Sequence, residues 1–130
     1  MNVRLATVDD LDVLPVGSLI FSMHRDEKGD TDMNLRLTGT RTVARPEFRE
    51  LAPFAFKDFA GGVDVLGNPD LKSSKIWNAD LRWEWFPKAG EVLAASLFYK
   101  DFKDPIEVVR LGGANIQTFQ NAAAARVFGF

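Results

Sequence analysis

The chain has 130 residues, of which 46% are apolar and 12% aromatic, and this length suits one domain at most. Its 16 Lys and Arg against 18 Asp and Glu give a net charge of −2, which leaves no excess of positive charge to hold a phosphate backbone. We therefore expect no nucleic-acid partner. With no Cys and one His, the sequence also excludes thiol catalysis, disulfide scaffolds and Cys- or His-rich metal sites, and we expect no cofactor.

Hydropathy limits how the chain can meet a membrane. No apolar run reaches the roughly 20 residues that a membrane-spanning helix needs, because charged residues interrupt each hydrophobic stretch. Near the N-terminus, Asp9, Asp10 and Asp12 stand where a secretory signal would need an unbroken apolar segment, so we expect no signal peptide. A transmembrane β-barrel stays open, since its strands alternate apolar and polar residues and escape hydropathy filters.

The first two predicted strands lie at residues 14–24 and 33–40. The earlier one is apolar but alternates poorly, through Leu19, Ile20 and Phe21. The later one alternates well, with Met33, Leu35 and Leu37 on one side and Asn34, Arg36, Thr38 and Thr40 on the other. Because successive side chains of a strand point to opposite faces, this pattern predicts one apolar and one polar face.

A long connection follows at residues 44–74, and charged residues gather near its start. Arg45, Glu47, Arg49 and Glu50 could contact an anionic or sugar ligand, or they could form a structural ion-pair network around two prolines. The structural interpretation is favoured, because four apolar residues in the same stretch suggest a loop that packs on itself: Phe48, Leu51, Phe54 and Phe56. Asp58, Asp64 and Asp70 lack the tight alternation of a calcium-binding loop.

The segment from Trp77 to Trp85 shows period two most clearly. Its odd positions are Trp77, Ala79, Leu81, Trp83 and Trp85, whereas its even positions are Asn78, Asp80, Arg82 and Glu84. This predicts a strand with a wholly apolar face and a wholly polar one. Asp80 and Glu84 could be read as an acid–base pair, but carboxylates four residues apart on a strand, with Arg82 midway between them, are better explained as structural charges.

Two more strands complete the pattern. Residues 93–100 alternate Leu93, Ala95, Leu97 and Tyr99 with a less polar set. Residues 118–130 form a strand or, through the run of Ala122 to Ala125, a short helix, and we favour the strand. The connections at 25–31 and 87–91 are short and contain Gly, whereas those at 44–74 and 102–117 are long, so short and long connections alternate.

Two architectures would bury a Trp-rich strand face. A soluble β-sandwich would place it against a second sheet, and an outer-membrane barrel would place it against lipid with the charged face toward a polar lumen. Trp83 and Trp85 lie beside a short connection, while Trp77 and Tyr99 lie near the opposite end, as two interfacial aromatic girdles would. Pattern alone leaves the barrel wall and the sandwich about equally supported.

Several ordered motifs resemble TonB-dependent outer-membrane receptors. They are Asp12-Val-Leu-Pro15, Asn34-Leu-Arg36, Thr40-Arg-Thr-Val-Ala-Arg-Pro-Glu-Phe-Arg-Glu-Leu-Ala-Pro-Phe54, Gly67-Asn-Pro-Asp-Leu71, Asn78-Ala-Asp-Leu-Arg82 with Glu84 and Phe86, Phe98-Tyr-Lys100, Asp104-Pro-Ile-Glu107 and Asn121. No single motif is diagnostic, but the ordered set covers nearly the whole chain and is similar to the later part of that family's barrel.

The resemblance implies an all-β fold: a curved antiparallel sheet of about five strands that forms a segment of a 22-stranded transmembrane β-barrel wall. It implies that residues 1–130 are part of a barrel domain, without plug or signal peptide, in the outer membrane of a Gram-negative bacterium. The parent receptor would import a scarce nutrient, such as a ferric siderophore, cobalamin or an oligosaccharide, with energy from TonB. Its partners would be outer-membrane lipid, the nutrient and, through segments absent from this chain, the TonB complex.

In this interpretation the two faces of the Trp-rich strand have opposite surroundings. Trp77, Leu81, Trp83 and Trp85 would face lipid, and Asn78, Asp80, Arg82 and Glu84 would face the lumen. No catalytic residue is expected. The alternatives are a soluble β-sandwich that serves in ligand binding or adhesion and, with only scattered carboxylates in its favour, an enzyme.

Overall fold

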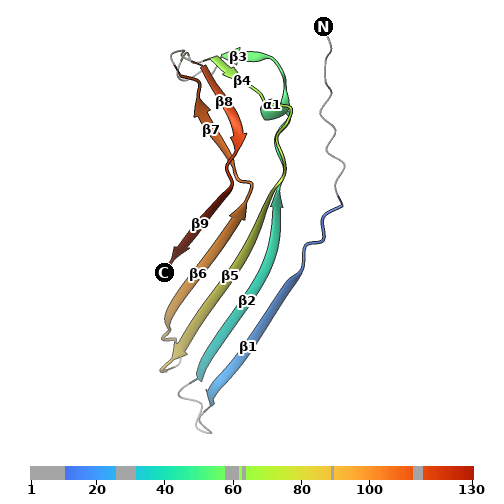
Figure 1. Ribbon diagram of the computed structural model, residues 1–130. Helices are drawn as coiled ribbons and strands as arrows, with labels where there is room; N and C mark the ends of the chain where they lie inside the picture. The colour runs from blue at the N-terminus through green and yellow to red at the C-terminus, as the bar shows by residue number, and fades with distance from the viewer. Residues whose placement is uncertain (1–10, 26–31, 58–61, 63, 89, 113–115) are drawn as a thin grey trace. The chain divides into compact units, whose positions relative to one another are not determined.

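A computed structural model describes residues 11–25, 32–57, 62, 64–88, 90–112 and 116–130, and the description below is confined to these. They form two sheets (Figure 1). The elements in chain order are β1 (Val16–Arg25), β2 (Asp32–Ala44), α1 (Phe48–Leu51), β3 (Ala55–Lys57), β4 (Asp64–Leu66), β5 (Ser74–Phe86), β6 (Leu93–Lys103), β7 (Ile106–Arg110), β8 (Ile116–Asn121) and β9 (Ala124–Gly129). Contacts divide the chain into two compact units, one around each sheet.

The large sheet has five strands in the order β1-β2-β5-β6-β9, and neighbouring strands run in opposite directions (Figure 1). β1 and β2 are in register through pairs such as Leu19 with Leu37 and Ser18 with Thr38, and the register shifts between Ser22 and His24. The expected antiparallel sheet of about five strands is therefore confirmed. The short connection predicted at 25–31 lies almost wholly outside the described residues.

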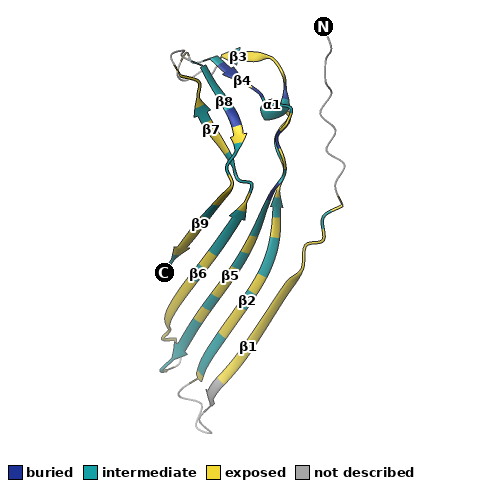
Figure 2. Cartoon of the chain, viewed as in Figure 1, coloured by how far each residue is buried: buried dark blue, intermediate teal, exposed yellow. Residues whose placement is uncertain are grey.

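Alternation gives the large sheet two chemically distinct faces. We call one the apolar face; it carries Leu19, Phe21, Leu35, Leu37, Trp77, Leu81, Trp83, Trp85, Leu97 and Tyr99. The other, the polar face, carries Ser18, Ser22, Asn34, Arg36, Thr38, Asn78, Asp80, Arg82, Glu84 and Lys100. Among the described residues of 13–42, 76–101 and 126–130, none is buried, and Figure 2 shows these strands in the colours of intermediate and exposed residues.

The small sheet has four strands in the order β3-β4-β8-β7. β4 runs parallel to β8, whereas β3 pairs with β4 and β7 pairs with β8 in antiparallel fashion. Val65, Leu71 and Phe119 form a buried cluster, and three partly buried side chains pack against it: Leu51, Phe56 and Ile106. The small sheet therefore has a hydrophobic core of its own.

Two asparagines tie the connections of this unit to its strands. The Asn68 amide donates to the Phe119 carbonyl at 2.9 Å, and its carbonyl oxygen accepts from the Asp70 N–H at 3.0 Å. Asn121 accepts from the Lys72 N–H at 2.8 Å and donates to the carbonyl oxygens of Lys72 at 3.0 Å and Asp104 at 2.7 Å. Asp104 has a positive φ of 54°. These bonds satisfy backbone groups that no strand ladder pairs.

Some expectations about the connections were wrong. The stretches 44–74 and 102–117 are not plain loops, because they contain α1, β3, β4 and β7. Residues 118–130 do not form one strand: β8 ends at Asn121 and β9 begins at Ala124, although the choice of strand over helix is confirmed. Of the four apolar residues expected to pack the first connection, Leu51 and Phe56 do so, but Phe48 and Phe54 are exposed.

The only helix among the described residues, the four-residue α1, is too short to cross a bilayer. The prediction about a signal peptide concerns residues that lie mostly outside the described part of the chain.

Candidate functional site

The polar face of the large sheet is linked by side-chain hydrogen bonds between neighbouring strands. The Asn78 amide on β5 donates to the hydroxyl oxygens of Thr40 and Thr42 on β2, at 3.2 and 3.3 Å. Along β5 itself, the Arg82 guanidinium donates to the Glu84 carboxylate at 2.7 Å. Three of the four residues predicted to share a face therefore have polar partners on that face.

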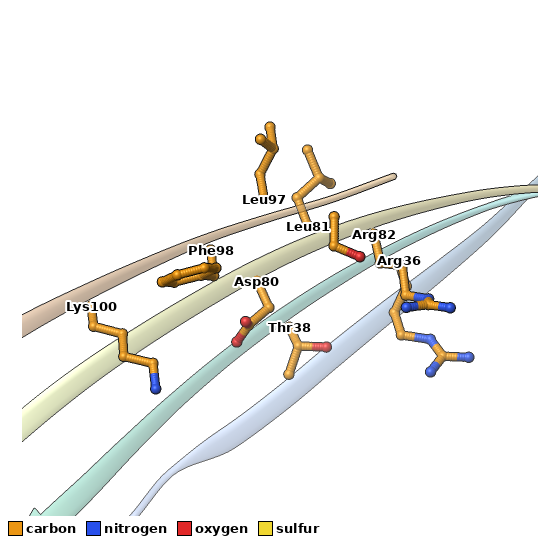
Figure 3. A pocket seen from close by; sticks show the side chains of 9 residues that line it. Arg36, Thr38, Asp80, Leu81, Arg82, Leu97, Phe98 and Lys100 are labelled. Atoms are coloured by element: carbon orange, nitrogen blue, oxygen red, sulfur yellow. The ribbon is translucent and has the colours of Figure 1, made fainter. Parts of the chain in front are cut away.

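A hollow of about 430 Å³ opens on this face across three strands. Its polar lining comes from Arg36 and Thr38 on β2, Asp80 and Arg82 on β5, and Ser96 and Lys100 on β6, with the Phe98 ring beside them. Figure 3 shows Leu81 and Leu97 projecting from the opposite side of the sheet to Thr38, Asp80 and Lys100.

Charge decides what the hollow can hold. Three cationic side chains line the hollow together with a single carboxylate, and these are Arg36, Arg82, Lys100 and Asp80. One of the cations, Arg82, also donates a hydrogen bond to Glu84. This arrangement favours an anionic or strongly hydrogen-bonding solute. Among the described residues, no group of three or more His, Asp or Glu side chains could hold a metal ion.

The apolar face carries aromatic side chains near both ends of β5. The rings of Trp83 and Trp85 stack with centroids 6.4 Å apart. At the other end, the Arg41 guanidinium lies over the Trp77 ring, 5.6 Å from its centroid. Between these ends, Ala79 and Leu81 complete a purely apolar stretch.

The charged cluster at the start of the first long connection has partners within the chain. Arg45 forms an ion pair with Asp12 at 3.4 Å, and Arg49 lies 5.4 Å from the centroid of the Phe56 ring. Glu47 and Glu50 form the capping box that begins α1, with the Glu47 N–H donating to the Glu50 carboxylate at 2.9 Å. These contacts fit the structural interpretation of the cluster, and ligand contact there stays a prediction.

Sequence reasoning missed part of the hollow and all of the charges on the apolar face. Lys100 and Phe98 alternate in step with Ser96, so the face of β6 on which they lie could be predicted from the sequence. Their place in the same hollow as Asp80 depends on how β6 pairs with β5, which the sequence does not show. The ion pair of Arg126 with Asp101, at 3.1 Å between β9 and β6, joins residues 25 positions apart with no local signal.

The motifs that carried the resemblance are mostly structural. Gly67 packs so closely on the backbone of Ala52 that a Cβ there would clash, and the Asn68 N–H donates to the Glu50 carbonyl at 2.6 Å. Leu71 lies in the core of the small sheet, and Asn121 holds the backbone at Lys72 and Asp104. These backbone and side-chain contacts stabilise the small sheet and its connections.

Comparisons with known proteins agree with this architecture. The family model described as "TonB dependent receptor-like, beta-barrel" matches residues 5–130. An iron-regulated outer membrane virulence protein of Vibrio cholerae is 34% identical over 61 residues, which are 47% of this chain and 9% of that protein. The crystal structure of the siderophore receptor PirA from Pseudomonas aeruginosa superposes with a TM-score of 0.68 at 22% identity, covering 89% of this chain and 23% of PirA.

The chain thus spans only a small part of each relative, 9% of one and 23% of the other. The family match nevertheless covers nearly all of its residues, including both sheets. It favours the barrel-wall interpretation over the soluble sandwich, and the family is one of receptors rather than enzymes. The chain belongs to the β-barrel family of TonB-dependent receptors, which lie in the outer membrane of Gram-negative bacteria.

Proposed function

We propose that these residues form part of the barrel wall of a receptor that takes up a scarce nutrient across the outer membrane with energy from TonB. The observation that carries the proposal is the large sheet, whose strands alternate apolar and polar side chains while no described residue of 76–101 is buried. A sheet with one apolar and one polar face, neither of them buried within the described chain, suits a barrel wall with lipid on one side and a polar lumen on the other.

The apolar face meets lipid in this proposal. Trp77, Leu81, Trp83 and Trp85 project from it, and the aromatic residues lie toward the two ends of β5 with Leu81 between them. Tryptophan prefers the headgroup level of a bilayer, whereas leucine prefers its hydrocarbon core. Asn78, Asp80, Arg82 and Glu84 face the lumen, where water and polar groups can solvate them.

Connectivity sets the orientation in the membrane. β2 and β6 end, and β5 and β9 begin, at the same end of the antiparallel large sheet, and in the sequence the segments of the small sheet lie between these strand ends. Outer-membrane barrels have short periplasmic turns and longer extracellular loops. The small sheet and the charged residues Arg45, Glu47, Arg49 and Glu50 are therefore extracellular, and the connection at 87–91 is periplasmic.

A ferric siderophore is the nutrient we favour over cobalamin or an oligosaccharide. One relative is named as iron-regulated and the other as a siderophore receptor. The hollow on the polar face, with Arg36, Arg82 and Lys100 against Asp80, would attract the anionic groups of such a complex. The extracellular cluster from Arg45 to Glu50 is a second candidate contact site, which the nutrient would reach before the hollow.

A whole receptor must close its barrel, because an open wall leaves unpaired backbone groups at both edges. β1 and β9 are the edge strands of the large sheet. We infer that residues 1–130 act as part of a larger barrel domain, and that contacts with a plug and with TonB are made by other parts of the receptor.

Acyl chains labelled with bromine test the orientation of the two faces. In the reconstituted receptor they should quench fluorescence from Trp83 and Trp85, each compared with its Trp→Phe variant. An absence of quenching at both positions would overturn the assignment of the apolar face to lipid.

An epitope tag beside Gly62 should be labelled on intact cells, and a tag at Gly90 should not; the opposite pattern would reverse the topology.

A further inference from the structure

The apolar face of the large sheet is not purely apolar, because charged residues interrupt it at one end. Arg41 follows Leu35 and Leu37 in the alternation of β2, and Asp101 follows Leu97 and Tyr99 in that of β6. Arg126 on β9 lies on the same face, since its guanidinium bonds to the Asp101 carboxylate. We call Arg41, Trp77, Tyr99, Asp101 and Arg126 the arginine row.

The row crosses four neighbouring strands at one level. Arg41 lies near the end of β2 and contacts Trp77 near the beginning of β5, with the guanidinium 5.6 Å from the ring centroid. Asp101 lies near the end of β6 and bonds at 3.1 Å to Arg126 near the beginning of β9. Because β2, β5, β6 and β9 are successive antiparallel strands, these positions are all at the same end of the sheet.

The guanidinium groups of the row keep open hydrogen-bonding capacity. Arg126 uses only its Nε toward Asp101 among the described residues, and its side chain is 72% exposed. Arg41 lies over the Trp77 ring and donates no side-chain hydrogen bond in the described part of the chain, and because its Nε is buried, a ligand would have to bind its two terminal nitrogens. An arginine has five N–H donors. The row holds two arginines and one carboxylate, which bonds only to Arg126, so N–H donors and positive charge stay unmatched.

The depth of the row follows from the spacing of the aromatic residues. Trp77 and Trp85 are 8 residues apart, which is about 27 Å along a strand, or about 20 Å across the membrane at a tilt near 40°. That nearly spans an apolar band of about 25 Å, so Trp77 and the arginines beside it reach the headgroup level. Arginine is strongly disfavoured on the lipid face at mid-depth and almost tolerated at the interface.

We propose that the arginine row binds the phosphate group of an anionic lipid in the outer leaflet. This rests on the proposed function, since it requires the apolar face to meet lipid. A lipid is favoured over a free phosphate because the row borders the apolar side chains of Leu81, Leu97 and Phe128, the last 81% exposed, which acyl chains below the headgroup would cover. Trp77 and Tyr99 are aromatic residues of the kind that favours the headgroup level of a bilayer.

The test measures the lipid that stays bound to the receptor. The receptor that carries this chain is reconstituted in vesicles of phosphatidylcholine and phosphatidylglycerol, extracted gently, and examined by native mass spectrometry. Wild type should retain phosphatidylglycerol in preference to phosphatidylcholine, and Arg126→Gln and Arg41→Gln should each lower that retention about fivefold, the effect of one basic residue near an anionic surface. Arg36→Gln is the matched control, because Arg36 lies on β2 with Arg41 but on the polar face.

A second variant keeps the test decisive if an arginine variant fails to fold. Asp101→Asn removes the carboxylate that competes for Arg126 and should raise retention of phosphatidylglycerol severalfold. An equal loss in Arg36→Gln, no change in Asp101→Asn, or no preference for the anionic lipid in wild type would overturn the proposal. So would inorganic phosphate that abolishes the preference by occupying the row without lipid. Brominated phosphatidylcholine that quenches Trp83 and Trp85 without any anionic preference would remove this inference alone, whereas no quenching at all would remove the proposed function.

Discussion

The two sheets of this chain are stabilised in opposite ways. The small sheet encloses Val65, Leu71 and Phe119, and asparagine side chains complete the hydrogen bonding of its connections. The large sheet has longer strands, yet no described residue of 76–101 is buried, and Trp77 is 53% exposed. The small sheet is stabilised by contacts within the described chain, whereas the stability of the large sheet depends on what its two faces contact.

In the proposed barrel wall, this difference would let one sequence contact two solvents. In water, exposed apolar surface of the kind that Leu19, Phe21 and Trp77 present would mark a site of association or aggregation. In a bilayer the same side chains would be in their preferred solvent, and a charged side chain placed among them would lower the stability of the sheet. Substitutions in the two sheets should therefore have effects that differ in kind as well as in size.

The largest effect should come from emptying the core of the small sheet. Phe119 is 8% exposed and packs with Val65 and Leu71, so Phe119→Ala should lower the free energy of unfolding of this unit by about 3–5 kcal/mol. Hydrogen exchange of the reconstituted receptor should then accelerate at β4, β7 and β8. Phe48→Ala is the matched control, since Phe48 is 81% exposed and its loss should change exchange little. Faster exchange in β1 as well would contradict the independence of the two sheets.

The next largest effect should come from placing a charge on the apolar face. Leu81 lies midway along β5, so Leu81→Arg should lower the stability of the assembled receptor by about 2–4 kcal/mol. The measurement is the fraction of receptor that reaches the heat-modifiable, folded form in vesicles. Asp80→Asn, one residue away on the polar face, should change stability by less than about 0.5 kcal/mol. Equal losses from both variants would contradict the assignment of different solvents to the two faces.

The large sheet was predictable from sequence because its signal is local. Period two over Trp77 to Trp85 fixed the faces of β5, and the same alternation identified β2 and β6 without any knowledge of the neighbouring strands. Even the poorly alternating β1 was located, because its apolar residues lie between turn-like segments.

The small sheet was missed because its signal is not local. β3 and β4 have three residues each, too few for a period to stand out. β4 pairs in parallel with β8, so that Val65 lies opposite Gln117, 52 positions away in the sequence. The arginine row could not be predicted from the sequence for the same reason, because Asp101 and Arg126 are brought together only by the pairing of β6 with β9.

The asparagine that ties the small sheet together should have an intermediate effect. Asn121 makes three hydrogen bonds to the backbone of Lys72 and Asp104, so Asn121→Ala leaves those groups unpaired and should cost about 1–3 kcal/mol. Asn121→Asp keeps the acceptor for the Lys72 N–H but loses both donated bonds, and should lose most of the same stability. Hydrogen exchange at Lys72 and at Ala122, whose N–H donates to Pro105, reports the loss. Wild-type exchange in Asn121→Ala would mean that these bonds contribute nothing to the unit.

The smallest effect should come from the ion pair on the polar face. Arg82 and Glu84 are joined at 2.7 Å with side chains 48% and 16% exposed, a degree of exposure at which a pair contributes about 0.2–1 kcal/mol. A double-mutant cycle of Arg82→Gln and Glu84→Gln should give a coupling in that range, and the coupling should shrink toward zero as salt is raised to about 1 M, where screening acts over about 3 Å. The neutral pair of Ser22 and Asn34, at 3.1 Å on the same face, is the matched control, because its coupling should not depend on salt.

A coupling above about 2 kcal/mol that survives high salt would show that the Arg82 pair is shielded from water. The polar face would then be covered by another part of the receptor at that point, and the contrast between a sheet with a core and a sheet between two solvents would hold for the apolar face alone.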